Sequence, residues 1–151
     1  NNFGQLGLGT RVTSVIVPRR VTIDAFVTSA CAGINHTAVI TGKGALWTCG
    51  CGAYGRLGLG DTEDRSVLSA VSSFKAKALV AAAGYYCTVV LDAEGVVWMS
   101  GRLRLFGGQQ SNTFTRVQFP DTPGLPPVRC AGVSCKDRHA LVWSAEGSLF
   151  S

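Results

Sequence analysis

The chain has 151 residues, of which 46% are hydrophobic and 15% are charged. This apolar content excludes a disordered polar tail, and no apolar run approaches the roughly 18–20 residues that a membrane-spanning helix needs. The formal net charge of +5 at pH 7 comes from lysines and arginines scattered singly or in pairs, which disfavours a dedicated nucleic-acid-binding module. Because the chain begins at Asn1 without an initiator methionine, we expect it to be a segment of a longer protein.

A repeat of about 50 residues organises the whole sequence. A turn-like segment followed by an apolar run occurs at 33–40, 84–91 and 136–143, and its equivalent positions are His36, Cys87 and His139. Further landmarks keep the same spacing in each copy. Such self-similarity at a fixed period is the signature of a repeat architecture.

The elements expected in chain order are short strands. Runs rich in Val, Ile, Leu and Thr, with the length of strands, occur at 12–17, 36–41, 67–71, 87–92, 116–119 and 139–144. A glycine closes the turn after three of them, as in a hairpin whose last turn residue needs positive φ. The strands that follow these turns carry Trp47, Trp98 and Phe150.

Short strands at this density indicate the blades of a β-propeller. The sequence therefore predicts an all-β fold, a partial β-propeller of three blades with about four antiparallel strands each, in a ring that this chain alone does not close. We assign the blades to residues 1–50, 51–101 and 102–151. A helical array is disfavoured, because only residues 74–83 could be read as a helix and their counterparts break that pattern.

The repeated motif resembles the regulator-of-chromosome-condensation repeat. Two small residues, Gly-x-x-His and an apolar strand occupy 30–40, Gly-x-Leu-Trp follows at 44–47, and the glycine-rich segment at 2–9 recurs at 53–60. The second copy departs from the pattern by having Cys87 in place of the histidine, and the third by having Lys136 in place of the glycine.

The resemblance implies a propeller of about seven blades, so that three blades leave apolar faces uncovered. Either further blades or a neighbouring chain would cover them. We therefore expect this segment on its own to aggregate or dimerise. Analytical ultracentrifugation checks this, and a monodisperse monomer that melts cooperatively would contradict it.

The repeated turn contains Gly33, His36, Gly84 and His139, for which we expect structural roles. Catalytic use of the histidines is disfavoured, because their positions recur in different blades and a cysteine fills the same position in the second copy. No nucleophile stands beside a unique histidine, so no catalytic residue is assigned. We expect each imidazole to hydrogen-bond backbone groups between strands.

The tryptophans Trp47 and Trp98 are expected to fill the core. Truncating Trp47 to alanine would then lower the stability by roughly 3–5 kcal/mol. The plant ultraviolet-B photoreceptor branch of the resembled family has a tryptophan directly after the motif glycine. Here that position holds Ile34, Tyr85 or Asp137, which disfavours light sensing.

No cofactor or metal is expected. Several of the six cysteines alternate with Ala or Ser in the repeat register, which is typical of small buried residues rather than zinc ligands. Free thiols favour an intracellular, reducing compartment, whether nucleus, cytoplasm or cytoskeleton. The glycines at 4–9 and 55–60 lack the following helix of a phosphate-binding loop, and we expect them to form tight connections between blades.

We interpret the segment as a non-catalytic protein–protein interaction platform within a larger protein or assembly. Its partners are the remaining blades or a neighbouring chain and one or more proteins, while nucleic acid or histone is a weaker alternative and no membrane insertion is expected. The loops that differ between copies, at 60–66, 109–115 and 121–128, are candidate contact surfaces. The individual candidate residues are Arg19, Arg20, Pro123, Pro126 and Pro127.

Two alternative functions stay open. The name-giving member of the resembled family implies guanine-nucleotide exchange on a Ran-type small GTPase with chromatin docking. The other alternative is a regulatory propeller fused to a ubiquitin ligase or another enzyme, with catalysis outside this segment.

Overall fold

A computed structural model describes residues 1–9, 13–102, 110–119 and 128–151 of the chain. Its regular structure is almost entirely antiparallel β, in three sheets. The first sheet contains β1 (Val27–Ala32), β2 (His36–Thr41), β3 (Leu46–Gly50) and β4 (Arg65–Ala70). The second contains β5 (Ala78–Ala83), β6 (Cys87–Asp92), β7 (Val97–Arg102) and β8 (Gln110–Arg116). The third contains β9 (Cys130–Lys136), β10 (His139–Ser144) and β11 (Leu149–Phe150).

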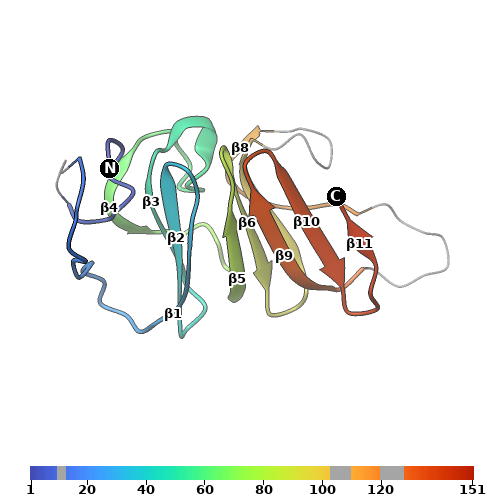
Figure 1. Cartoon of the computed structure of the whole chain (residues 1–151). Helices are drawn as coiled ribbons and strands as arrows, with labels where there is room; N and C mark the ends of the chain where they lie inside the picture. Colours follow the sequence, from blue (N-terminus) through green and yellow to red (C-terminus); the bar gives the residue numbers. More distant parts are fainter. Residues whose placement is uncertain (10–12, 103–109, 120–127) are drawn as a thin grey trace.

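The sheets stand side by side as the blades of a partial propeller (Figure 1). Within each sheet the strands follow one another in chain order, and the first strands β1, β5 and β9 are neighbours. The three blades do not close a ring, which confirms the fold expected from the repeat. We number the blades 1 to 3 along the chain.

The sheets are out of phase with the repeat ranges 1–50, 51–101 and 102–151. Strand β4 lies in the second range but pairs with β3 of blade 1, and β8 lies in the third range but pairs with β7 of blade 2. Each of these blades therefore takes its outermost strand from the following repeat.

The strand expected at 12–17 is wrong over its described part, since residues 13–17 form no strand. Its counterparts β4 and β8 are strands because β3 and β7 offer them backbone hydrogen-bond partners. Among the described residues, the segment at 13–17 has no such partner strand. Strand β8 also begins earlier than the expected range 116–119 and ends where that range begins.

The interface between blades 1 and 2 is an apolar layer supplied by both sheets. Its buried members are Ala38, Ile40, Leu46, Val71, Ala78, Val90 and Phe114. Cys31, Leu59, Phe74, Ala81 and Trp98 pack against this layer and are partly buried. Because Val90 points into this layer while its neighbours in β6 point the other way, both faces of blade 2 are covered.

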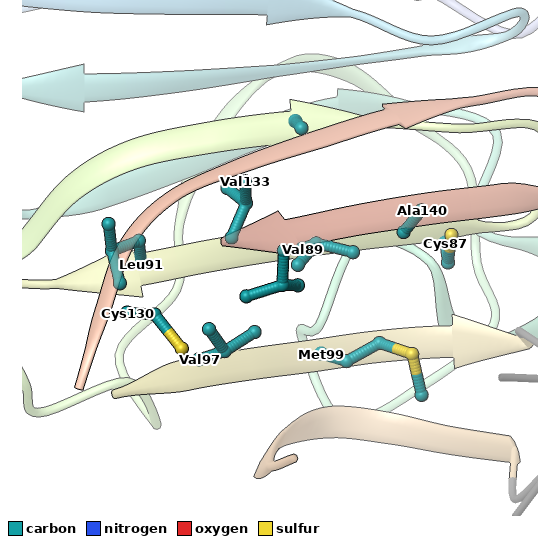
Figure 2. Packing of buried hydrophobic residues seen from close by; sticks show 10 residues of the cluster. Cys87, Val89, Leu91, Val97, Met99, Cys130, Val133 and Ala140 are labelled. Carbon is teal, nitrogen blue, oxygen red and sulfur yellow. The ribbon is translucent and has the colours of Figure 1, made fainter. Parts of the chain in front are cut away.

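A second apolar layer separates blades 2 and 3 (Figure 2). Val89 and Leu91 of β6 and Val97 of β7 meet Val133 of β9 and Val142 of β10 there. Burial of both faces explains why the sequence of β6 is a continuous apolar run instead of an alternating one.

The glycine-rich segments at 1–9 and 53–60 pack in the same way on successive blades. Leu8 forms a bridge with Val67 of β4, and Leu59 forms one with Thr113 of β8. The second segment begins with a single 3-10 turn, η1 (Ala53–Gly55). Since the glycines in both segments adopt positive φ, they serve the tight connections that the sequence predicts.

The outer face of blade 3 is apolar and open. Trp143 and Leu149 are 41% and 65% exposed, and these two residues pair across β10 and β11. Leu141 and His139 alternate with Trp143 along β10 and share its face. This open face supports the prediction that the segment alone aggregates or dimerises.

Candidate functional site

One edge of the three blades gathers connections from all of them, and we call it the upper rim (Figure 1). The turns between β1 and β2, β5 and β6, and β9 and β10 lie at this edge, together with η1. The turns after β2, β6 and β10 lie at the opposite edge, because each of these strands runs away from the upper rim.

A buried hydrogen-bond network ties blade 1 to blade 2 beneath the upper rim. His36 Nε2 lies 2.9 Å from Thr88 Oγ1, and the Thr88 hydroxyl donates to the Arg56 carbonyl oxygen at 2.7 Å. A hydroxyl has a single proton, so His36 Nε2 must be the donor to Thr88. The imidazole therefore carries a proton on Nε2, and the residue is fully buried.

The motif glycines Gly33 and Gly84 lie at positions where there is no room for a side chain. A Cβ on Gly33 would lie 2.6 Å from His36 Cε1 and from the Gly84 carbonyl oxygen. A Cβ on Gly84 would lie 2.7 Å from Cys135 Sγ. The structure places both glycines at close contacts between neighbouring blades, in keeping with the structural role proposed for them.

The repeated position of His36 is used differently in each blade. Cys87 lies 3.6 Å from Cys135, measured between their sulfur atoms, and so also faces the next blade. His139 is exposed on the open face of blade 3. The expectation that each imidazole bonds backbone groups between strands is incomplete for His36, because its Nε2 bonds the Thr88 side chain of the next blade. This position faces across the interface between blades.

The buried histidine makes stability depend on pH. Burial, followed by the charge of Arg56, lowers the pKa of His36 from 6.5 to about 4. Between these values the unfolded chain takes up a proton that the folded chain refuses, so stability falls as pH falls from 6.5 to 4. We expect a loss of about 3 kcal/mol across this range from this group.

Urea unfolding at a series of pH values checks this prediction. The His36→Gln variant, which keeps a polar side chain without a titrating group, is expected to lose this part of the pH dependence. A pH profile equal in shape for both proteins would show that His36 does not titrate as described.

Three tyrosines and two exposed arginines cluster on the upper rim. Tyr54 and Tyr86 pack edge to face with ring centroids 4.9 Å apart, and Tyr85 lies 4.2 Å from Tyr86. Arg102 lies over Tyr54 at 5.6 Å, and Arg138 lies 6.0 Å from each of the other two rings. We call Tyr54, Tyr85, Tyr86, Arg102 and Arg138 the tyrosine–arginine patch.

Arg56 lies beneath the patch and holds it in place. Its guanidinium donates to the carbonyl oxygens of Ala53 at 2.8 Å and Tyr85 at 2.7 Å, and it lies 5.2 Å from the Tyr86 ring centroid. The side chain is only 2% exposed. Tyr54 itself has a positive φ of 64°, a conformation that non-glycine residues seldom adopt. The contacts of the patch therefore fix a backbone turn that is unfavourable by itself.

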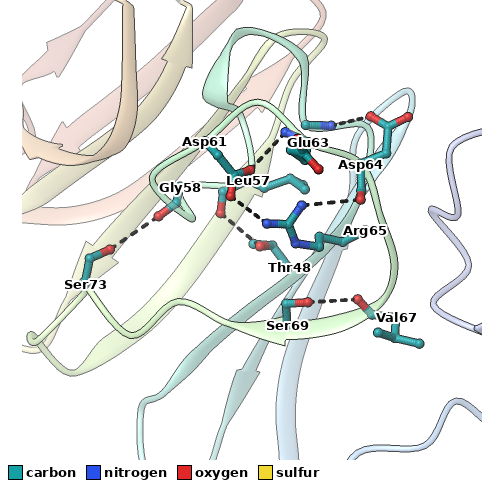
Figure 3. A network of polar contacts seen from close by, with 11 residues as sticks. Thr48, Leu57, Gly58, Asp61, Glu63, Asp64, Arg65, Val67, Ser69 and Ser73 are labelled. Carbon is teal, nitrogen blue, oxygen red and sulfur yellow. Dashed lines mark hydrogen bonds and ion pairs between the residues drawn. The ribbon is translucent and has the colours of Figure 1, made fainter.

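The loop at 60–66 follows η1 in the chain and is acidic (Figure 3). Asp61 accepts the Glu63 amide at 2.9 Å and pairs with Arg65, and Asp64 accepts the Gly52 amide at 2.9 Å. The hydrogen bond from the Glu63 amide and the interaction with Arg65 lower the pKa of Asp61. Asp61 is thus bonded within its own loop, and Asp64 ties the loop to the residue before η1.

The two tryptophans lie in different surroundings. Trp98 is partly buried against the layer between blades 1 and 2, and its indole Nε1 donates to Asp92 at 2.7 Å. Trp47 occupies the same position in blade 1 and is also partly buried, but among the described residues no second sheet covers its side. The proposal of core filling is therefore supported for Trp98 and weakened for Trp47.

The residues proposed for partner contact are only partly described. Arg19 and Arg20 are exposed and lie in the segment before β1. Pro123, Pro126 and Pro127 lie outside the described residues, as do Gln109 and most of the loop at 121–128. The sequence analysis missed the patch, because it interpreted the scattered arginines as ordinary surface charge. The signal available was the aromatic pair at 85–86 in a turn that carries other residues in the other copies.

The described residues were compared with the expectations about cysteines, metal ions and membrane insertion. All six cysteines are free, and four of them are buried. Within the described ranges, no group of His, Cys, Asp or Glu is arranged to hold a metal ion. In the same ranges, no helix has the length and apolar character required to cross a bilayer.

Comparisons with known proteins agree with the architecture. The secretion-regulating guanine nucleotide exchange factor of Bos taurus is 29% identical over 99% of this chain, and the ultraviolet-B receptor UVR8 of Arabidopsis thaliana is 38% identical over 99%. The chain covers 33% and 34% of these two proteins, about a third of the length of each.

Solved structures and a family model complete the comparison. Human WBSCR16 superposes with a TM-score of 0.80 at 23% identity, covering 99% of this chain and 40% of that one. Prp20p of Saccharomyces cerevisiae superposes with a TM-score of 0.79 at 18% identity, covering 94% and 37%. These likenesses show the fold. The family model described as the regulator of chromosome condensation (RCC1) repeat matches residues 1–40 and 43–91, more than half of the chain. The chain therefore belongs to the RCC1 repeat family.

Proposed function

We propose that this chain is a non-catalytic protein–protein interaction platform and that its contact surface is the upper rim. The observation that carries the proposal is the tyrosine–arginine patch, to which three separate connections contribute. Tyrosine and arginine are the residue types, with tryptophan, that most often dominate the energy of protein interfaces. An ordered cluster of both at one edge of stiff blades is suited to binding a partner.

The patch is pre-organised by the packing beneath it. Buried Arg56 bonds two backbone carbonyls, and the Arg56 carbonyl accepts from Thr88 and Ser100 of blade 2. Side chains that are already ordered lose less conformational entropy on binding, which favours affinity. The rigid frame therefore supports the function without contributing chemistry of its own.

Affinity purification with purified tagged chain tests this proposal. The double variant Tyr54→Ala/Tyr86→Ala is expected to lose proteins that the unchanged chain captures from a cell extract, as measured by quantitative mass spectrometry. Arg116→Ala is the matched control, because Arg116 also lies over an aromatic ring, that of Trp98 at 5.8 Å, but at the opposite edge. Capture of the same proteins by all three forms would refute the upper rim as the contact surface.

Guanine-nucleotide exchange is a second candidate function. It is favoured by the likeness to the exchange factor of Bos taurus, which extends over 99% of this chain. Because the chain covers only 33% of that protein, the activity is tested most directly by nucleotide release from Ran with and without the purified chain. Nucleotide release at the uncatalysed rate would show that this segment does not catalyse exchange on Ran, and it would leave the platform proposal unaffected.

A further inference from the structure

We propose that the tyrosine–arginine patch binds an acidic peptide segment of the partner protein, with Arg102 and Arg138 each receiving a carboxylate. This inference rests on the proposed platform function and specifies the chemistry of the partner.

The first support is the geometry of the two exposed arginines. Arg102 lies over the Tyr54 ring, and Arg138 lies over the rings of Tyr85 and Tyr86. An aromatic ring within about 6 Å attracts a guanidinium, and the planar N–H fork of a guanidinium matches a carboxylate. The tyrosines thus hold both cations in positions from which they can bind an anion.

The second support is the lack of an internal counterion. Among the described residues, neither Arg102 nor Arg138 forms an ion pair. The carboxylates of Asp61 and Asp64, in the loop at 60–66, are bonded to Arg65 and to the Gly52 amide. The two guanidinium groups therefore remain available to a partner.

The third support is the buried charge of Arg56. Its guanidinium is 2% exposed and bonds neutral carbonyl oxygens, with no carboxylate paired to it within the described part of the chain. Its field reaches its neighbours, since it contributes to the lowered pKa of His36. A buried cation without a counterion is costly, and an anion bound on the patch above it would reduce that cost.

The groove beside the patch accommodates an extended chain. It has a volume of about 420 Å³ and is lined mostly by small residues at the ends of β1, β5 and β9, together with Ile34, Lys136 and the acidic Asp137. Lys136 adds a third cation at its edge, and Ile34, which is 51% exposed, adds an apolar contact. A segment in which acidic and apolar residues alternate would place carboxylates on the patch and an apolar side chain in the groove.

The same features favour a peptide over nucleic acid. Only a few cations surround the patch, and Asp137 interrupts them between Lys136 and Arg138. A nucleic-acid surface usually presents a continuous stripe of lysine and arginine along a phosphate backbone. The tyrosine floor and the apolar contact suit amino-acid side chains.

Fluorescence anisotropy with purified chain tests the inference. The probe is a short labelled peptide in which glutamates alternate with leucines, and its matched control has glutamine in place of every glutamate. We expect the acidic probe to bind and the glutamine probe to bind at least about tenfold more weakly, which corresponds to about 1.4 kcal/mol. Raising the salt concentration is expected to weaken binding of the acidic probe.

Variants separate the patch from general charge. Arg102→Gln/Arg138→Gln is expected to weaken binding of the acidic probe about tenfold or more. Each single variant, Arg102→Gln or Arg138→Gln, is also expected to weaken it, while Arg116→Gln, which removes one positive charge at the opposite edge, leaves it unchanged. Arg102→Lys keeps the positive charge without the planar fork, and we expect its affinity for the acidic probe to lie between those of the unchanged chain and the double glutamine variant. Thermal melts of each variant check that the exposed substitutions leave the fold intact.

Three results would overturn the inference: no binding of the acidic probe, equal binding of the glutamine probe, or equal binding by the double glutamine variant. Tighter binding of a single-stranded oligonucleotide than of the peptide would also overturn it, in favour of nucleic acid. If any of these results occurs while Tyr54→Ala/Tyr86→Ala still loses captured proteins, the platform function stands and only the acidic partner is wrong.

Discussion

Replacing Trp98 with alanine is expected to lower the free energy of unfolding by about 3–5 kcal/mol. The indole packs edge to face on Phe74 with centroids 5.6 Å apart, and it contacts the layer between blades 1 and 2. The substitution leaves a cavity in that layer. It also removes the indole N–H that Asp92, a buried carboxylate, accepts at 2.7 Å.

Trp47→Ala is the matched comparison, because Trp47 occupies the same repeat position without a second sheet against it in the described structure. We expect its cost to stay below about 2 kcal/mol, in the ordinary range for partly exposed positions. Trp98→Phe keeps an aromatic ring and isolates the hydrogen bond, with an expected cost of about 1.5–3 kcal/mol. Equilibrium urea unfolding measures all three, and equal costs for the two alanine variants would show that the layer between the blades does not stabilise Trp98.

Gly58→Ala is expected to destabilise the chain by about 2–5 kcal/mol, combining backbone strain with overpacking. Gly58 has φ of +71°, and a Cβ there would lie 2.2 Å from an atom of the Phe114 ring. Phe114 is buried and packs on Phe74, with ring centroids 5.5 Å apart, so its ring cannot move aside freely. The added methyl group would therefore push the glycine-rich segment at 53–60 away from blade 2.

Gly60→Ala separates these two effects. Gly60 also has positive φ, at +95°, but a Cβ there meets nothing within 4 Å. We expect this variant to show only the backbone strain, about 1–2 kcal/mol. Urea midpoints and slopes of both variants provide the comparison, and a Gly58→Ala protein as stable as Gly60→Ala would mean that the contact with Phe114 relaxes without cost.

The repeat allowed much of the architecture to be predicted without coordinates. The spacing of His36, Cys87 and His139 placed β2, β6 and β10, and the glycine turns after these strands placed β3 and β7. Local signals suffice there because an apolar run and a turn glycine act on neighbouring residues. Local signals did not suffice for the strand expected at 12–17, because a strand also needs a partner strand that its own sequence does not supply.

The candidate site could not be predicted in this way. Tyr54 and Arg138 come from two different connections and Arg102 from the end of β7, and no spacing along the chain brings them together. Scattered arginines read as ordinary solubilising charge until the turns that carry them meet at one edge. His36 and His139 likewise have the same motif, yet one is buried and the other exposed.

By itself, the amino-acid sequence determined the strand type, the turn positions and the three-fold repetition, because these depend on the side-chain pattern and on glycine within a few residues. Only the tertiary structure decided which repeated residues face a neighbouring blade, which face solvent and which gather at the upper rim. The physical reason is that burial and contact between blades depend on what lies opposite each face. Equivalent positions of a repeat therefore do different things when their neighbours differ.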